Sequence, residues 1–406
     1  MINYELVGYN NSVNLNTITY PLYFYIELTD KCNFNCKFCS VGNKGKNYIS
    51  FDLLKKFLLE LKEKNILDVY DTGGEPLLHP NFKEIIEYGN SLGFRQTVLT
   101  NGFFLDKYKD ILDKILCVCV SLHGSDSIHD KLVGISCYNK VISNIKMAKK
   151  ITNVNINCTI LKDNQNINEM INILEFGRKN NIQVSFSKYN NIGKGKQNNC
   201  SINIKNFSEI LDSLYKKGYE FKINDCIPTC LVEEKYEYLT HGCGAGYLFG
   251  SLTYNGDIKI CPSSSRIIGN IENKSFKKLW YSVQMKKYRK FEWIPIYCKS
   301  CKNLSKCRAG CKVELEKNIT DFNDYLVTEM IDNIWNNIKN KKARVNISLI
   351  RKDKSSYINL STPPRKFNKN VLSVINKLND GCPLIELEEY KDLIVTLYRD
   401  KLLEVE

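Results

Sequence analysis

Apolar and polar positions follow two different periods in the first half of the chain. Short runs rich in β-branched and aromatic residues, typical of buried strands, alternate with longer segments whose apolar residues recur every three or four positions, typical of amphipathic helices. The predicted strands cover residues 22–29, 67–72, 95–100, 115–122, 154–161 and 182–188. The predicted helices lie near residues 51–63, 80–92, 105–113, 138–151 and 167–179.

This alternation predicts βαβ units around a parallel sheet, and therefore an α/β protein. Chemistry in such sheets gathers where the strands end and the loops begin. Each of the first four predicted strands ends in a polar motif. The motifs are CNFNCKFC at 32–39, DTGGEP at 71–76, TNG at 100–102 and SLHG at 121–124. We expect these four motifs to meet at one edge of the sheet.

The regular alternation is predicted to stop in a polar, turn-rich segment, residues 189–206, so a domain boundary is expected between about 205 and 230. The region that follows, to about residue 320, is dense in cysteine, and Asn255-Gly256 predicts a hairpin turn there. A helix over 322–340 then leads to a small αβ tail. The tail is predicted to hold strands at 346–350 and 356–360 and helices at about 368–378 and 384–398. The predicted domains are 1–215, 216–340 and 341–406.

The length of 406 residues supports more than one domain. No apolar run approaches the roughly 18–20 residues that a membrane-spanning helix needs. The N-terminal segment lacks the basic flank, apolar stretch and cleavage site of a signal peptide. We therefore expect a cytoplasmic protein without a membrane partner.

Charge and cysteine content refine this expectation. The net charge is +14, but lysine far outnumbers arginine, and nucleic-acid sites rely on the arginine fork, so we expect no nucleic-acid partner. The 17 cysteines of a cytoplasmic chain are difficult to interpret as disulfides, because reducing compartments keep thiols free. Metal ligation is the better interpretation.

The first cysteine motif has the spacing CxxxCxxC on a loop after a strand. Three thiolates, from Cys32, Cys36 and Cys39, can bind three irons of one 4Fe-4S cube and leave the fourth iron open to a cofactor or substrate. The alternative is a structural zinc loop, but such a loop prefers four ligands in two pairs.

This loop and the GGEP motif at 73–76 together resemble the radical S-adenosylmethionine (SAM) superfamily. The resemblance implies a partial (β/α)6 TIM barrel in which SAM binds the open iron of the 4Fe-4S cluster and is cleaved to a 5′-deoxyadenosyl radical. It also implies cofactor contacts for six residues. Gly73, Gly74 and Glu75 would hold the methionine amine, the Phe38 backbone would meet the adenine, Ser121 would make a polar contact, and Asn101 is a weaker match.

The second group of cysteines resembles the SPASM extension, which carries auxiliary iron-sulfur clusters in maturases of peptides and proteins. The pattern is Cys243, Gly256 and Cys261, followed by a CxxCxxxxxCxxxC run that starts at Cys298. The resemblance implies two auxiliary clusters. Cys243, Cys261 and Cys311 would ligate the first, and Cys298, Cys301 and Cys307 the second. A zinc ribbon is the alternative for this spacing.

The final cysteine of the SPASM pattern is missing, since none occurs between Cys311 and Cys382. Asp321 or Asp324 could supply an oxygen ligand, Cys382 could fold back, or the second cluster could be absent. The first cluster could be completed by one of two cysteines that precede it closely, Cys226 and Cys230.

The remaining cysteines are expected to behave as small buried apolar residues. They are Cys117, Cys119, Cys137, Cys158 and Cys200. The four histidines, at positions 79, 123, 129 and 241, show no metal-ligand spacing, and only His123 is expected at the functional edge of the barrel.

The tail from residue 345 resembles the small winged-helix leader-recognition proteins of the PqqD type. Such modules bind an extended leader peptide as an added strand at a sheet edge. Leader binding and a degenerate cap that only packs on the enzyme are both compatible with this sequence.

Together these resemblances imply a radical maturase of a ribosomally made peptide, which forms a thioether or C–C crosslink or carries out an oxidation. The implied partners are a precursor peptide with a leader and an electron donor such as flavodoxin or ferredoxin. The alternatives are a protein-oxidising maturase of the anaerobic sulfatase-maturing type and a small-molecule dehydrogenase. A sensor or binding protein would have little use for the GGEP loop and Ser121.

Overall fold

The computed structural model describes most of the chain. The described residues are 4–6, 20–40, 45–190, 192–198, 200–239, 242–291, 294, 298, 301, 303–313, 325–345, 350–353, 356–359, 365–367, 369–399 and 403–406. His241, Asp321 and Asp324, three residues considered in the sequence analysis, lie outside them.

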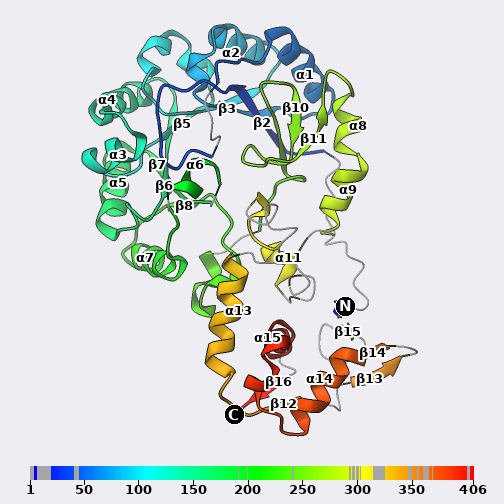
Figure 1. Cartoon of the computed structure of the whole chain (residues 1–406). Helices are drawn as coiled ribbons and strands as arrows, with labels where there is room; N and C mark the ends of the chain where they lie inside the picture. The colour runs from blue at the N-terminus through cyan, green and yellow to red at the C-terminus, as the bar shows by residue number, and fades with distance from the viewer. Residues whose placement is uncertain are drawn as a thin grey trace.

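Six parallel strands form the centre of the N-terminal half, in the order β2-β3-β4-β5-β6-β7 (Figure 1). They are β2 (Tyr23–Thr29), β3 (Asp68–Gly73), β4 (Arg95–Thr100), β5 (Cys117–Ser121), β6 (Asn153–Ile160) and β7 (Gln183–Lys188). Each strand overlaps its predicted range, because alternating or continuous apolar runs of this length leave little choice of element. The predicted α/β class with a parallel sheet is confirmed.

The connecting helices cover the outer face of these strands (Figure 1). They are α1 (Phe51–Glu63), η1 (Pro76–Leu78), α2 (Phe82–Ser91), η2 (Leu105–Lys114), α3 (Asp126–Val133), α4 (Tyr138–Lys149) and α5 (Ile167–Asn180). In α1 the residues at helical spacing, Leu54, Phe57, Leu58 and Leu61, are buried against the sheet. The predicted helix at 105–113 is a 3₁₀ segment with a kink at Tyr108, and α3 was not predicted.

The sheet extends beyond these six strands on both sides. After α6 (Gly193–Gln197) and α7 (Ile204–Lys216), the short β8 (Lys222–Ile223) pairs parallel with β7. The alternation of helix and strand thus continues one step past the point where the sequence predicts it to stop. A two-residue strand is too short to give a periodic signal.

On the other side, the cysteine-rich region adds a hairpin to the same sheet. The strands are β9 (Phe249–Leu252), β10 (Asp257–Lys259) and β11 (Ile267–Asn270). Strand β9 pairs parallel with β2, so that Tyr23 lies opposite Phe249, and β10 returns antiparallel. Gly256, with a φ of 83°, forms the predicted hairpin turn. The middle region is therefore joined to the barrel by backbone hydrogen bonds.

Short helical segments fill the rest of the middle region. They are η3 (Thr229–Leu231), η4 (Glu234–Leu239), α8 (Phe276–Trp280), α9 (Val283–Arg289) and α11 (Leu304–Cys307). Of these, α8 packs against α1 and β11 and so rests on the barrel.

The described residues of the C-terminal part form two small sheets, three α-helices and one 3₁₀ helix. Its elements are α13 (Tyr325–Ile338), β12 (Ala343–Val345), β13 (Ile350–Asp353), β14 (Ser356–Asn359), β15 (Arg365–Phe367), α14 (Lys369–Asn379), η6 (Leu384–Tyr390), α15 (Lys391–Arg399) and β16 (Leu403–Val405). The N-terminal strand β1 (Tyr4–Leu6) joins this part, giving a sheet in the order β1-β15-β14-β13. Antiparallel β12 and β16 form the second sheet. The sequence predicted β14, α14 and α15 but not β1, β12, β15 or β16. The strand predicted at 346–350 lies outside the described residues except for Ile350, which begins β13.

The apolar face of α13 packs into the C-terminal part. Ile331, Trp335 and Ile338 lie in one buried cluster with residues of α14, η6 and α15. The predicted domains place this helix at the end of the middle region, and α13 also contacts η3 of that region. Within the residues that the structure describes, no helix combines the length and apolar character needed to cross a membrane.

Candidate functional site

The loop after β2 carries Cys32, Cys36 and Cys39, and all three side chains are half-buried. The loop is shaped by its own backbone, since the Cys39 N–H donates to the Cys36 carbonyl at 3.3 Å. The Phe34 N–H donates to the Cys32 sulfur at 3.4 Å. The three thiols thus share one compact turn at the carboxyl edge of the barrel.

The end of α3 and the start of α6 support this turn from outside. The N–H groups of Asn35 and Lys37 donate to carbonyls of the last turn of α3, at 3.0 and 3.2 Å. The Lys194 N–H donates to the Cys39 carbonyl at 3.0 Å. Gly193 contacts the same carbonyl so closely that a Cβ would lie 2.2 Å from it. Neither α3 nor α6 was predicted to touch the cysteine loop.

The two glycines of the GGEP motif lie against the backbone that leads into the cysteine loop. The Gly74 N–H donates to the Thr29 carbonyl at 2.6 Å, and the Glu75 N–H donates to the Lys31 carbonyl at 2.8 Å. A Cβ on Gly73 would lie 2.3 Å from the Thr29 oxygen, and one on Gly74 would lie 2.2 Å from the Lys31 oxygen. Only glycine permits this approach, so the pair fixes the two loops together.

The Glu75 carboxylate is directed into the protein, and its side chain is only 1% exposed. Oε1 accepts hydrogen bonds from the Thr100 hydroxyl at 2.6 Å and the Leu77 N–H at 3.2 Å, while Oε2 accepts from the Asn101 N–H at 2.8 Å. Burial raises the pKa of Glu75 to about 7, and these donors oppose the rise. The carboxylate therefore joins the ends of β3 and β4.

Asn101 continues this chain of contacts to the cysteine loop. Its Nδ2 donates to Oδ1 of Asn33 at 2.9 Å, and its own Oδ1 accepts the Phe103 N–H at 3.0 Å. The loops after β2, β3 and β4 are thus connected through side chains. The Nδ2 of Asn33 is buried and has no hydrogen-bond partner among the described residues.

Phe38 and Ser121 lie near His123, which follows β5. The rings of Phe38 and His123 meet edge to face at 4.8 Å between centroids. His123 is buried, its Nδ1 accepts the Thr159 N–H at 3.2 Å, and burial lowers its pKa to about 3. His123 is therefore neutral and carries its proton on Nε2. Ser121 is half-buried at the end of β5.

The interior of the barrel is lined by polar side chains on alternate positions of the strands. In β6 the half-buried Asn155, Asn157 and Thr159 alternate with buried apolar residues that pack outward. Oδ1 of Asn157 accepts hydrogen bonds from Ser185, Ser187 and Asn224, at 3.2, 2.9 and 2.9 Å. This network was not predicted, although the alternation of polar residues in β6 is a signal for it.

A buried ion pair joins the cysteine-rich hairpin to the barrel interior. The Lys259 ammonium on β10 lies 2.7 Å from the Glu27 carboxylate on β2, and the two side chains are 12% and 9% exposed. Ser251 on β9 also donates to Glu27, at 3.4 Å. Burial raises the pKa of Glu27, and Lys259 counteracts that rise.

Four cysteines come together where the hairpin meets the segment after β8. The Cys226 thiol hydrogen-bonds with the thiols of Cys243 and Cys311, and Cys261 lies close enough to both for their charges to affect its pKa. The hydrogen bond from Cys226 lowers the pKa of Cys243, which favours the thiolate form that binds metals. Of the two cysteines that could complete this group, the structure places Cys226 in it.

Cys230 lies elsewhere, although it is only four residues further on. It packs against the apolar cluster of the C-terminal part, as do Cys298 and Cys382. Cys301 is half-buried and precedes α11, whereas Cys307 is 6% exposed and is the last residue of α11. The Cys382 sulfur contacts the Glu386 carboxylate and the Pro383 carbonyl, both at 3.8 Å.

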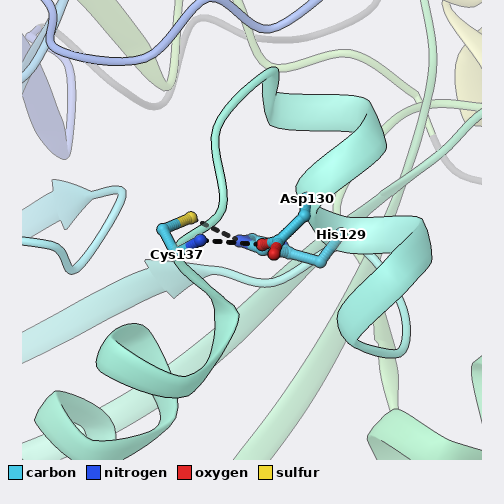
Figure 2. A group of neighbouring side chains, drawn as sticks. All are labelled: His129, Asp130 and Cys137. Carbon is cyan, nitrogen blue, oxygen red and sulfur yellow. Dashed lines mark hydrogen bonds between the residues drawn. The ribbon is translucent and has the colours of Figure 1, made fainter.

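Three ligand-type side chains that the sequence analysis did not group also meet, between α3 and α4 (Figure 2). The ligand atoms of His129, Asp130 and Cys137 lie within 4.8 Å of one another. His129 Nδ1 accepts the His123 N–H at 3.2 Å and Nε2 lies 3.6 Å from the Cys137 sulfur. Oδ1 of Asp130 accepts the N–H groups of Cys137 and Tyr138, at 3.0 and 2.9 Å, which caps α4.

The hydrogen bonds of these three side chains already use the atoms that would have to bind a metal. Burial also lowers the pKa of His129 to about 4 and raises the pKa of Cys137 to about 12, so both side chains are neutral. We interpret the group as a structural cap. The other cysteines expected in the core are buried, except for the half-buried Cys119. His79 is also structural, since its Nε2 lies 3.0 Å from the Ile49 carbonyl.

Two protein families match the chain in the regions that carry these sites. Residues 26–177 match the Radical SAM superfamily, and residues 243–312 match SPASM, an iron-sulfur cluster-binding domain. The chain is a radical SAM enzyme with a SPASM domain. Its cofactors are SAM and a 4Fe-4S cluster in the radical SAM domain, and its SPASM domain binds auxiliary iron-sulfur clusters.

Curated relatives of this radical SAM enzyme have different activities. An AdoMet-dependent heme synthase of Methanosarcina barkeri is 25% identical over 328 residues, which are 73% of this chain and 92% of the relative. A probable GTP 3′,8-cyclase of Saccharolobus islandicus is 32% identical over 181 residues, which are 42% of this chain but only 58% of the cyclase.

Solved structures share the fold over a larger part of the chain. SuiB of Streptococcus suis, bound to the precursor peptide SuiA, matches with a TM-score of 0.62 and 22% identity, covering 74% of each chain. The enzyme anSMEcpe with bound AdoMet matches with a TM-score of 0.57 and 18% identity, covering 78% of this chain and 100% of that one. At these identities the similarity establishes the fold.

The donor sets of this radical SAM enzyme fit iron-sulfur clusters. Cys226, Cys243, Cys261 and Cys311 offer four thiols from separate segments, which meet although no disulfide joins them. In the radical SAM domain, Asn33 follows Cys32 directly, and its buried Nδ2 has no hydrogen-bond partner within the described part of the chain. An amide at this position is suited to donate to a cluster sulfur.

Proposed function

We propose that this enzyme is a radical maturase that modifies a ribosomally made peptide by crosslinking or oxidation. In this proposal Cys32, Cys36 and Cys39 ligate the 4Fe-4S cluster. When bound there, the cluster and SAM supply an electron and a 5′-deoxyadenosyl radical that abstracts hydrogen from the substrate.

The residues around the cysteine loop would hold SAM. Gly73 and Gly74 present backbone groups rather than side chains next to the loop, in keeping with a bound methionine amine. Oε2 of Glu75 accepts a hydrogen bond from a single donor among the described residues, so it can accept a further one while it positions Asn101. The backbone of Phe38 and the side chain of Ser121 are the proposed contacts on the adenine side.

The observation that carries the peptide assignment is the shared fold with SuiB and anSMEcpe, two structures that were solved with bound peptides. The polar interior at Asn157 supports it, because a peptide offers many donors and acceptors to such a lining.

The C-terminal sheet offers an edge for a leader peptide. Strand β13 is the last in the order β1-β15-β14-β13, and β1 covers the opposite edge at β15. A leader that adds to this sheet would pair with β13, or with β15 after displacing β1. If the leader binds at β13, its affinity is expected to stay the same after deletion of residues 1–6. If it binds at β15, the deletion removes β1 from that edge, and the affinity is expected to rise.

We further propose two auxiliary clusters with different upstream ligands. Cys226 would complete the first cluster with Cys243, Cys261 and Cys311, because its thiol contacts two of them. Cys230 would complete the second with Cys298, Cys301 and Cys307 in place of the missing final cysteine, because Cys230 and Cys298 pack against the same apolar cluster. Flavodoxin or ferredoxin would supply electrons.

Reconstituted protein with SAM and dithionite tests the first part of this proposal. We expect 5′-deoxyadenosine, and none from the Cys32→Ala, Cys36→Ala, Cys39→Ala variant. Co-expression with short peptides encoded near its gene tests the second part. Loss of two hydrogens from such a peptide supports a maturase, whereas cleavage of SAM with every such peptide unchanged contradicts it.

The second candidate function is that of a protein-oxidising maturase of the anSME type, which would oxidise a serine or cysteine in a folded protein. The fold of anSMEcpe is covered in full by this chain, and that favours it. The two candidates differ in their need for the C-terminal part, which only leader-guided modification requires.

A further inference from the structure

Lys312 is a lysine whose side chain is fully buried, next to the cysteines assigned to the first auxiliary cluster. It follows Cys311 in the chain, and its Nζ donates a hydrogen bond to the Ala245 carbonyl at 2.6 Å. Three aromatic rings surround Nζ, with centroids at 3.6, 4.8 and 5.7 Å: Tyr247, Tyr288 and Phe291. The side chain therefore ends in an aromatic cage rather than in solvent.

A buried ammonium group requires compensating negative charge, because its transfer out of water is very unfavourable. The faces of the aromatic rings offer part of this compensation. The charged and titratable groups that act on Lys312 are the thiols of Cys243 and Cys226 and the guanidinium groups of Arg308 and Arg289. In the described part of the chain, the acidic groups that act on this lysine are thus cysteine thiols and not carboxylates.

Ala245 connects the ammonium group to one of these cysteines. Its carbonyl accepts the hydrogen bond from Lys312, while its N–H donates to the Cys243 sulfur at 3.4 Å. The turn that presents the thiolate therefore also fixes the position of the cation. Lys312 is absent from the sequence motifs, and burial of a lysine next to a ligand cysteine cannot be inferred from spacing.

We propose that Lys312 is the buried counter-ion of the first auxiliary cluster and raises its reduction potential, so that this cluster accepts an electron more readily. This inference rests on the proposed ligand set of Cys226, Cys243, Cys261 and Cys311. Four thiolates give a 4Fe-4S cluster a net negative charge, which grows by one when it is reduced. A fixed positive charge in a medium of low dielectric constant stabilises the reduced form more than the oxidised form.

The test is a redox titration, followed by electron paramagnetic resonance, on protein that holds only this cluster. Replacement of Cys32, Cys36, Cys39, Cys298 and Cys301 by alanine gives that background. In it, Lys312→Met removes the charge and the hydrogen bond, whereas Lys312→Gln removes the charge but keeps a donor for Ala245. Lys286→Met is the matched control, since Lys286 is an exposed lysine on α9.

We expect both Lys312 variants to lower the midpoint potential by at least about 59 mV, a tenfold change in the one-electron equilibrium. The Lys286→Met variant is expected to leave it unchanged, because solvent screens its charge. If Lys312→Met does not assemble a cluster, Lys312→Gln alone decides the question.

An unchanged potential in Lys312→Gln protein that contains the cluster would overturn the proposal. A potential that falls in Lys312→Met and is restored in Lys312→Gln would also overturn it, since the hydrogen bond and not the charge would then be responsible. Absence of iron from the background protein would instead contradict the ligand set proposed above.

Discussion

The side-chain amide of Asn101 donates a hydrogen bond to Oδ1 of Asn33 at 2.9 Å, and so connects the loop after β4 to the cysteine loop after β2. The backbone N–H of Asn101 is held at the same time by Glu75. The residue that the sequence identified as the weakest cofactor match thus occupies the centre of a network that joins three loops.

Replacement of this amide should weaken cofactor binding without loss of the cluster. We expect Asn101→Ala to raise the Kd for SAM about tenfold, since loss of a hydrogen bond in a buried network costs about 1–1.5 kcal/mol. Iron content should stay the same. Asn90→Ala is the control, because Asn90 also bonds a carbonyl through Nδ2 but lies exposed on α2. Equal SAM affinity in both variants would contradict the positioning role.

The close approach of Gly74 to Lys31 predicts a steric effect. We expect Gly74→Ala to separate the loops after β2 and β3, to lower the unfolding free energy by about 1–3 kcal/mol and to abolish SAM cleavage. Gly218→Ala is the control for function, because its added Cβ has no atom within 4 Å. It should lower the unfolding free energy through strain at its φ of 77° but leave SAM cleavage intact. Thermal unfolding and assays of 5′-deoxyadenosine measure both effects. Full activity of Gly74→Ala would show that the contact is dispensable.

Asp71 predicts a pH dependence of stability. This carboxyl group is 1% exposed behind the sheet, its Oδ2 accepts a hydrogen bond from Gln96 at 3.1 Å, and burial raises its pKa to about 7. The pKa of this carboxyl group is higher in the folded than in the unfolded protein. Its contribution to the free energy of unfolding is therefore fully present below about pH 4 and is lost as the pH rises to about 7.

The Asp71→Asn variant lacks this ionisation, and its amide can donate to the buried Oε1 of Gln96, which has no partner among the described residues. We expect the Tm of the metal-free variant to exceed that of the parent protein, by a margin that grows from pH 5 to pH 7 and then levels off. Scanning calorimetry across this pH range measures the margin. A constant margin would mean that Asp71 does not titrate in this window.

The contact between Cys226 and the thiols of Cys243 and Cys311 predicts the effect of removing it. We expect Cys226→Ala to lower the iron content of reconstituted protein by up to about four atoms per chain and to remove the resonance of the first auxiliary cluster. Cys158→Ala removes an equally buried thiol from β6 and should leave the iron content unchanged.

A corresponding experiment distinguishes the roles of Cys226 and Cys230. Cys230→Ala should resemble the Cys298→Ala, Cys301→Ala variant and affect only the second cluster, since Cys230 and Cys298 pack against the same apolar cluster. Iron content that is unchanged in both variants would reject a second auxiliary cluster. Loss of the first cluster in Cys230→Ala would reject the assignment of Cys226.

The sequence by itself determined the barrel strands and the chemistry at their ends. Each barrel strand, of five to eight residues, gives a periodic signal, and the short spacing of Cys32, Cys36 and Cys39 fixes them on one loop. The Asn255-Gly256 turn was equally local, because a positive φ at Gly256 is a property of two residues.

Contacts between segments far apart in the chain were decided only by the tertiary structure. Spacing could not choose between Cys226 and Cys230, because the chain between them bends so that one thiol meets Cys243 and the other faces the C-terminal part. Nor could it show the pairing of β1 with β15, or the aromatic cage around Lys312. Burial and long-range pairing depend on which surfaces meet, and periodicity along one segment carries no information about the partner of that segment.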